Sequence, residues 1–141
     1  MIDLTKSQIE YLKAIYEVEQ NNEVTITNIA KHLNCSKPSV VRALKTLDKL
    51  KLINYKDNIK LTKLGTTYVN NIRRKDNILQ IFFIDVLKID KDIAIKDAES
   101  IKDLISCYTI TKLEEYLKNT LNIKTKDIDN YCLCNECKKK E

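Results

Sequence analysis

Apolar side chains recur every three or four positions along most of this 141-residue chain, and this period predicts a mainly helical fold. The first such stretch, residues 5–20, repeats Ile9, Leu12 and Ile15 on one face, and Thr5 precedes it as a helix cap. The same criteria predict five further helices, over residues 25–33, 37–50, 62–87, 90–106 and 110–121. The chain contains only one Gly and one Pro, which argues against an all-β fold with many tight turns.

One segment departs from the helical period. "LINYKDNIKLT", residues 52–62, reads as two short strands, "INY" and "IKL", joined by a "KDN" turn. Helix, turn, helix and hairpin then follow one another over residues 25–61. This is the order of a winged helix-turn-helix, in which the second helix reads DNA.

The apolar run "ILQIFFIDVL", residues 78–87, is hydrophobic on most sides of its predicted helix. A helix of this kind is buried, here expected between two subunits. The run is too short to cross a membrane and contains Gln80 and Asp85. The chain start lacks the pattern of a signal peptide, so a cytoplasmic location without membrane attachment is expected.

Three parts are therefore expected along the chain. They are a winged helix-turn-helix domain over residues 1–72, an all-helical dimerisation domain over residues 73–121, and a cysteine-containing tail over residues 122–141.

Charge is distributed unevenly over these parts. Residues 31–75 contain twelve Lys or Arg residues and only two acidic ones, Asp48 and Asp57, whereas acidic residues outnumber basic ones in the remainder. A basic segment beside an acidic one favours a nucleic-acid-binding face and a separate regulatory part. The alternative is a solvated, lysine-rich surface without a partner.

The second helix of the module, residues 37–50, buries a Val and Leu stripe and leaves its basic residues on the other side. Arg42 can reach base edges in a major groove, where a bidentate contact to guanine discriminates by roughly 1–3 kcal/mol. The lysines are better placed for phosphates, which add affinity without sequence information. The expected DNA-binding residues are Ser36, Lys37, Ser39, Arg42, Lys45 and Lys49 on the helix and Lys56 and Lys60 on the hairpin. A winged helix that binds protein instead of DNA is the alternative.

Several blocks of the sequence occur in an order that resembles a known family. They are "LTKSQIEYLKAIYEVE", "TITNIAKHLNCSKPSVVRALKTLDKLKLI", "IKLTKLG", "RRKDNILQIFFIDVLKID" and "KDAESIKDLIS". Together they resemble the iron- and manganese-dependent repressors of the DtxR/MntR type. The resemblance implies a sequence-specific regulator, most simply a repressor, that binds palindromic operators as a homodimer. It also implies the short manganese-type form, because the chain has no segment matching the extra SH3-like domain.

The resemblance further implies a regulatory metal site, normally occupied by Mn²⁺ or Fe²⁺, but several ligand positions are altered here. Asp76 and Asp103 stand where the family has histidines, and Lys13 and Lys102 stand where it has carboxylates. The oxygen donors that remain are Glu10, Asp76, Glu99 and Asp103.

These substitutions allow two interpretations. In one, the four carboxylates form an oxygen-rich site for a hard cation such as Mn²⁺, weakened by the nearby lysines. In the other, which the charges favour, the lysine ammonium groups replace the metal in a salt-bridge network. The spacing of Glu99, Lys102 and Asp103 also fits a plain solvated helix face.

The chain closes with "NYCLCNECKKKE", in which Cys132, Cys134 and Cys137 lie within six positions. Thiolates at this spacing suit Zn²⁺, an iron–sulfur cluster or Cu(I), with Cys107, His32 or a partner-chain residue as a fourth ligand. The following lysines would lower thiol pKa values, so a redox-active pair is an alternative. The tail can also have no role of its own.

An enzymatic function has little support. The chain has a single His, no Gly-rich phosphate loop and no recognisable pairing of nucleophile and base. The sequence therefore predicts a non-enzymatic transcriptional regulator. The alternatives are a protein-interaction module with a winged-helix fold and a thiol-based redox regulator without metal sensing.

Overall fold

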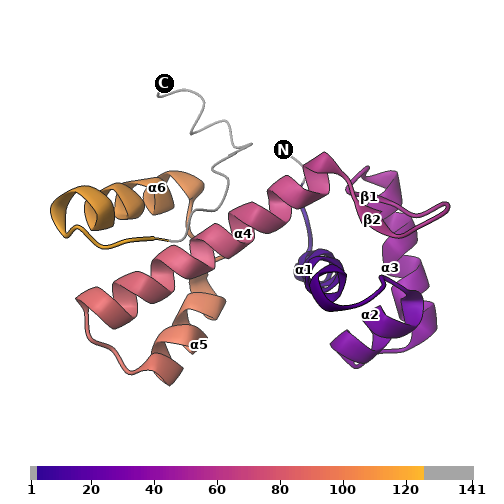
Figure 1. Cartoon of the computed structure of the whole chain (residues 1–141), viewed down its shortest axis with the longest axis horizontal. Helices are drawn as coiled ribbons and strands as arrows, with labels where there is room; N and C mark the ends of the chain where they lie inside the picture. The colour runs from indigo at the N-terminus through magenta and orange to yellow at the C-terminus, as the bar shows by residue number, and fades with distance from the viewer. Residues whose placement is uncertain (1–2, 126–141) are drawn as a thin grey trace. The chain divides into compact units, whose positions relative to one another are not determined.

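The computed structural model describes residues 3–125, which form a mainly helical chain as predicted (Figure 1). Two compact units meet between Val69 and Asn70. This boundary lies within one long helix, α4 (Lys63–Ile81).

The first unit has the predicted order of helix, turn, helix and hairpin. Ile53 of the first strand lies opposite Leu61 of the second in an antiparallel pair. The predicted bounds agree with the structure to within one or two residues. The elements are α1 (Lys6–Asn21), α2 (Ile26–Leu33), α3 (Lys37–Lys49), β1 (Ile53–Asn54) and β2 (Lys60–Leu61), followed by the start of α4.

Hydroxyl side chains cap the first three helices of this unit. Thr5 Oγ1 accepts from the Gln8 amide at 3.2 Å while Gln8 Oε1 accepts from the Thr5 amide at 2.9 Å, which is a capping box. Thr25 caps α2 by accepting from the Asn28 amide, and Ser36 caps α3 by accepting from the Ser39 amide. These caps satisfy amides that have no partner within the helix, and they explain why the helix starts were predictable.

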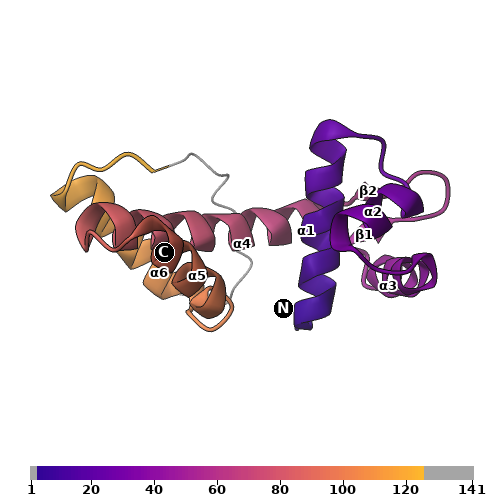
Figure 2. The same cartoon turned by 90° about the horizontal axis from the view of Figure 1, so that it is seen from below.

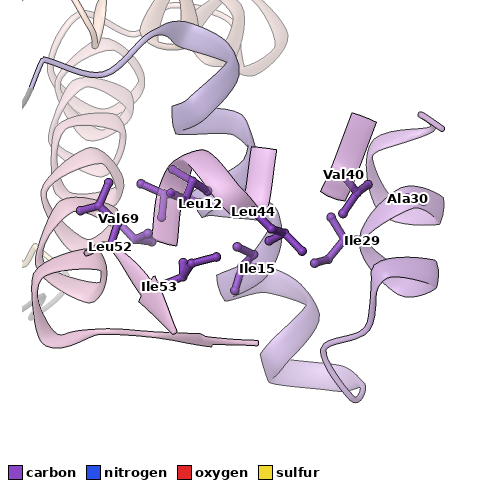
Figure 3. Close-up of a cluster of buried hydrophobic side chains, with 10 residues drawn as sticks. Leu12, Ile15, Ile29, Ala30, Val40, Leu44, Leu52, Ile53 and Val69 are labelled. Carbon is purple, nitrogen blue, oxygen red and sulfur yellow. The ribbon is translucent and has the colours of Figure 1, made fainter. Parts of the chain in front are cut away.

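One apolar cluster joins the elements of the first unit (Figure 3). Leu12 and Ile15 of α1 and Val40 and Leu44 of α3 belong to this cluster. The cluster is completed by Ile29, Ala30, Leu47, Leu52, Ile53 and Val69. Because α1, α2, α3 and the hairpin share this core, the exposed side of α3 is held in a fixed position relative to the hairpin.

The single glycine of the chain fixes where α4 begins. A Cβ atom at Gly65 would lie 2.0 Å from the carbonyl oxygen of Leu52. The same carbonyl accepts a hydrogen bond from the Thr62 amide at 3.0 Å, and Thr62 Oγ1 accepts from the Gly65 amide at 3.1 Å. The backbone at Leu52, just before β1, and the start of α4 therefore approach more closely than any larger residue at position 65 allows.

Gly65→Ala is expected to destabilise the protein by at least about 2 kcal/mol, because the added methyl group would push the two backbone segments apart. This result opposes intrinsic helix propensity, which favours Ala over Gly. Urea denaturation followed by circular dichroism measures the effect. Lys63→Ala, an exposed change in the same helical turn, is the control and should leave the unfolding free energy nearly unchanged. Equal stability of Gly65→Ala and the parent would contradict the close approach.

The second unit contains the later turns of α4 and two further helices beside them (Figures 1 and 2). The long helix continues into a π-helical segment, Phe82–Val86, which ends close to the predicted residue 87. The helices that follow are α5 (Lys91–Ile101) and α6 (Cys107–Glu115), the latter continuing as a π-helical segment, Tyr116–Thr120.

Two predicted boundaries in this unit are wrong. The helix expected over residues 90–106 ends at Ile101, and the helix expected to begin at 110 begins at Cys107. The reason is a cap that the apolar period does not reveal, since Ser106 Oγ accepts from the Thr109 amide at 3.1 Å. Residues 102–105 therefore connect two helices rather than extending the first.

A smaller apolar cluster holds the second unit together. Ile78 and Leu79 of α4 pack on Ala98, Ile110 and Leu117. Part of the apolar run 78–87 is thus already buried within one chain, while Leu87 remains 51% exposed. Pairing of two subunits through this run stays a prediction.

A buried ion pair lies beside this cluster. Arg74 of α4 and Glu114 of α6 are 6% and 7% exposed, and Arg74 Nε donates to Glu114 Oε2 at 3.0 Å. Lys118 Nζ lies 3.1 Å from the second carboxylate oxygen, and Arg74 also donates to Thr111 Oγ1 at 3.2 Å. Burial on its own would raise the pKa of Glu114, but the hydrogen bonds from Arg74 and Lys118 outweigh it and lower that pKa.

Glu114→Gln is expected to cost about 3 kcal/mol of unfolding free energy at pH 7, since it leaves the buried Arg74 guanidinium without its counter-charge. The loss should shrink in acid. A lowered folded pKa stabilises the protein above the ordinary value of 4.5, and this contribution disappears as the pH falls through the folded value.

Denaturant titrations from pH 7 to pH 3 measure this difference. Glu115→Gln is the matched control, because Glu115 is an exposed neighbour paired with exposed Lys112, and it should change stability by less than about 1 kcal/mol. Equal losses of unfolding free energy for the two variants would mean that the buried pair stabilises the protein no more than the exposed pair does.

Candidate functional site

The residues predicted to bind DNA lie on the outer side of α3 and on the hairpin. Lys37, Arg42, Lys45 and Lys49 are exposed, whereas Val40, Leu44 and Leu47 are buried. Lys56 and Lys60 on the hairpin are also exposed. Helix geometry thus separates the two sets of α3 residues onto opposite faces, as the sequence period predicted.

Short polar side chains hold the start of α3 and its arginine. Ser36 Oγ lies 2.8 Å from Ser39 Oγ, and Ser39 Oγ accepts from Arg42 Nη2 at 3.5 Å. Ser36 therefore serves as helix cap and as the first member of a hydrogen-bonded row. This row restricts Arg42 before any ligand binds, which reduces the entropy lost on binding.

The single carboxylate of α3 is turned away from its basic face. Asp48 Oδ1 accepts from the Tyr55 amide at 3.2 Å, which ties the end of α3 to the hairpin. Asp48 is therefore structural, and no other acidic residue lies on α3. The exposed side of this helix carries only positive charge, which suits a polyanion.

Sequence reasoning missed one contact at this site. Tyr11 of α1 lies with its hydroxyl 3.7 Å from Cys35 Sγ, immediately before the Ser36 cap. Burial first, and then the hydrogen bond with Cys35, raise the pKa of Tyr11 above its ordinary value of 10.0. Cys35 is partly buried and packs against the first apolar cluster. The sequence gives no signal for the pair, because the two residues lie 24 positions apart.

The four oxygen donors expected from the resemblance are found in different surroundings. Glu10 is exposed on α1 of the first unit. Asp103 is exposed in the turn after α5, not on the helix face where it was expected. Asp76 Oδ2 accepts from Gln80 Nε2 at 2.9 Å, and Asp76 Oδ1 is buried without a partner among residues 3–125.

Lys102 is the residue of this set that departs most from an ordinary surface lysine. It is 3% exposed, and its Nζ donates to Glu99 Oε2 at 2.6 Å. Lys102 is also the C-cap of α5, where its amide donates to the Ala98 carbonyl. The Glu99 carboxylate is thus already occupied by a positive charge of the chain itself.

These donors do not fit a divalent cation held in the way the family implies. A metal ion of this class needs several oxygen or nitrogen ligands around one point, and Glu99 is already paired while Asp103 faces solvent. A divalent ion within about 4 Å of the Lys102 ammonium would be repelled by about 8 kcal/mol at an effective dielectric constant of about 20. Among residues 3–125, no three His, Cys, Asp or Glu side chains are grouped so that they could hold a metal.

The cysteines of the tail were the other expected metal ligands. Cys132, Cys134 and Cys137 lie outside the described residues, so the thiolate site stays a prediction. Two suggested fourth ligands have other contacts, because His32 Nε2 lies 2.6 Å from Glu17 Oε2 and Cys107 Sγ accepts from Arg74 at 3.9 Å.

Within the described part of the chain, no helix has the length and apolar character needed to span a membrane.

Comparison with family profiles gives two matches that together cover most of the chain. Residues 3–59 match the profile described as "Iron dependent repressor, N-terminal DNA binding domain". Residues 62–123 match the profile described as "Iron dependent repressor, metal binding and dimerisation domain". The first range contains the basic face of α3, and the second contains the Lys102–Glu99 pair.

One curated relative is an uncharacterized HTH-type transcriptional regulator, MJ0568, from Methanocaldococcus jannaschii. It is 27% identical over 119 residues, which cover 82% of this chain and 95% of the relative. The similarity thus extends over nearly the whole length of that regulator.

Solved structures show the same similarity. The hypothetical protein SSo2273 from Sulfolobus solfataricus is 28% identical with a TM-score of 0.69, over 81% of this chain and 89% of its own. ScaR with bound Zn²⁺ is 26% identical with a TM-score of 0.72, over 79% of this chain. The manganese regulator SloR is 25% identical with a TM-score of 0.66, over 82% of this chain. This chain spans only about half the length of these last two, 53% and 55% respectively.

Proposed function

Because this chain belongs to the iron-dependent repressor family, we propose that it is a homodimeric transcriptional regulator that recognises a palindromic operator through α3. Repression is the simplest mode, since a dimer seated on an operator blocks access to the DNA beneath it. The proposal places the protein in the cytoplasm, where it meets DNA, and gives it no catalytic activity of its own.

The basic face of α3 carries this proposal. Lys37, Arg42, Lys45 and Lys49 are exposed on it, and the only acidic residue of the helix is bonded to the hairpin. An α-helix fits the major groove of B-form DNA, where arginine discriminates guanine by two parallel hydrogen bonds. Arg42 is assigned to a base edge, and the lysines of α3 and of the hairpin are assigned to phosphates.

A dimer is proposed because one α3 reads only a short half-site. Residues 62–123 match a dimerisation profile, and the run 78–87 retains exposed apolar surface at Leu87. Two copies related by a two-fold axis would present two α3 helices to successive major grooves, about 34–36 Å apart. An operator of matching symmetry follows from this geometry.

The candidate effectors are metal ions, without a choice between the ions of this family. Membership of the iron-dependent repressor family, the manganese regulator SloR and the Zn²⁺-bound ScaR make Fe²⁺, Mn²⁺ and Zn²⁺ the ions to test on this chain. Zn²⁺ is the better candidate for the cysteines of the tail, because thiolates prefer softer ions.

The direct experiment is selection of bound sequences from a random DNA library, followed by fluorescence anisotropy on the selected site and on a scrambled version. The proposal predicts a selected palindrome and strong preference over the scrambled DNA. Equal, salt-sensitive binding to all DNA would leave the protein-interaction module as the better account. Loss of preference on oxidation, restored by reductant, would favour the thiol-based regulator.

Arg42→Ala is expected to relax base preference at one position of each half-site by about 1–3 kcal/mol, because the two hydrogen bonds to a base edge are lost. Anisotropy on a panel of single-base operator variants measures this preference. The fold should be unaffected, since Arg42 is exposed. Unchanged discrimination at every position would remove Arg42 from the set of base-reading residues.

Lys45→Ala is expected to weaken binding to all DNA alike and to reduce the slope of log affinity against log salt by about one. Lys96→Ala, an exposed change on α5, is the control and should leave the slope unchanged. A selective effect of Lys45→Ala on one base pair would instead mean that Lys45 reads sequence.

A further inference from the structure

We propose that Lys102 supplies, from within the chain, the positive charge that a bound metal ion would supply at the end of α5, so that this regulator binds its operator without a metal. The inference rests on the proposed DNA-binding function. It concerns how operator binding is regulated, through a charge in the second unit, and adds no new activity.

The first observation is the burial of the Lys102 ammonium. Lysine is almost never fully buried unless it is paired, yet Lys102 is only 3% exposed and lies 2.6 Å from the Glu99 carboxylate. Removing an ammonium group from water is costly, and a nearby carboxylate is what offsets that cost. The ammonium is therefore held in place by the surrounding structure and not by chance surface contact.

The second observation is where this charge lies. Lys102 follows the last residue of α5, Ile101, and caps the helix C-terminus. The C-terminal end of a helix presents unpaired carbonyl oxygens and a partial negative charge, which favour a cation. With Glu99 one turn earlier, this end of α5 requires positive charge, and Lys102 provides it.

A second lysine acts on the same connection. Lys75 of α4 donates from Nζ to the Ile105 carbonyl at 2.8 Å, in the turn that joins α5 to α6. Backbone carbonyls and carboxylates are the oxygen ligands that a hard metal ion takes. Two of them in this unit, the Ile105 carbonyl and the Glu99 carboxylate, are bound instead by ammonium groups of the chain.

A tethered ammonium differs from a metal ion because it cannot dissociate. A metal ion bound at the Glu99 carboxylate would lie close to the Lys102 ammonium, which is 3% exposed and would repel it. The remaining donors do not compensate, since Asp103 is exposed and Asp76 offers one unpartnered oxygen. The Lys102 ammonium thus stays at the end of α5 whether or not metal ions are present, and Lys75 ties the α5–α6 connection to α4.

The test uses the full chain, its selected operator, and Mn²⁺, an ion that prefers oxygen ligands over the thiolates of the tail. Operator affinity is measured by anisotropy in chelator and in excess Mn²⁺, and the melting temperature is measured in the same two conditions. The parent should bind equally tightly in both, within about twofold, whereas allosteric coupling to a metal typically changes affinity by about 5–150-fold. Its melting temperature should not move, because an ion that does not bind the folded state cannot stabilise it.

Lys102→Glu restores a carboxylate and removes the internal charge. It should bind the operator at least about fivefold more weakly in chelator and recover at least about fivefold with Mn²⁺. Lys102→Gln removes the charge without adding a ligand, so it should weaken binding in chelator and gain no response to Mn²⁺. Lys96→Glu, the same charge change at an exposed position of α5, should behave as the parent does.

Three results would overturn the inference. One is parent binding that strengthens about fivefold or more with Mn²⁺. Another is a Mn²⁺-dependent rise in the parent's melting temperature. The third is folded Lys102→Gln that binds as tightly as the parent in chelator. If Lys102→Glu does not fold, Lys102→Gln decides the matter.

Failure of the proposed function would look different. In that case the parent shows no sequence preference in chelator or in Mn²⁺, and the melting experiment still reports whether a hard metal binds. An unmoved melting temperature then supports the internal charge, and a raised one refutes it.

Discussion

The burial of one face of α3 is the constraint on which the function of this chain depends. Val40, Leu44 and Leu47 recur at helical spacing and are all fully buried against α1, α2 and the hairpin. A helix held by this face must present its other side to solvent, and that side carries the lysines and Arg42. The same packing fixes the hairpin, because Leu52 and Ile53 belong to the same cluster. The packing of the apolar face of α3 thus determines which of its residues are exposed for DNA binding.

The second unit is held together differently. Its apolar cluster is small, and the unit also contains two ion pairs with buried charged groups. Arg74 and Glu114 are both buried, whereas in the pair of Lys102 with Glu99 only the lysine is buried. Buried ion pairs are seldom the most stabilising choice for a core, but removal of one partner is costly. Arg74 with Glu114 ties α4 to α6, whereas Lys102 with Glu99 is a local pair at the end of α5.

Much of the fold follows from local sequence signals. The caps Thr5 and Ser36, the Val and Leu stripe of α3 and the hairpin turn all lie within a few residues of what they determine, so they were predictable. The exposed basic residues of α3 follow from the same helical period. The boundaries of α5 and α6 were predicted wrongly because Ser106 interrupts a continuous apolar period.

The ion pairs could not be located in the same way. Arg74 and Glu114 are 40 positions apart, and no periodic pattern links them. Lys102 drew attention because it stands where the resembled family has a carboxylate. Its burial depends on tertiary packing, which the period of apolar residues does not reveal. The placement of Asp103 depends on where α5 ends, which explains why its expected position on a helix face was wrong.

The most direct test of this account is the ratio of affinities for the selected operator and for its scrambled version, measured in chelator alone. Specific binding through α3 with an internal charge at Lys102 predicts a preference of about a thousandfold or more without any added metal. A preference that is absent in chelator and appears only when Mn²⁺ is added would contradict it, because the positive charge would then have to come from outside the chain.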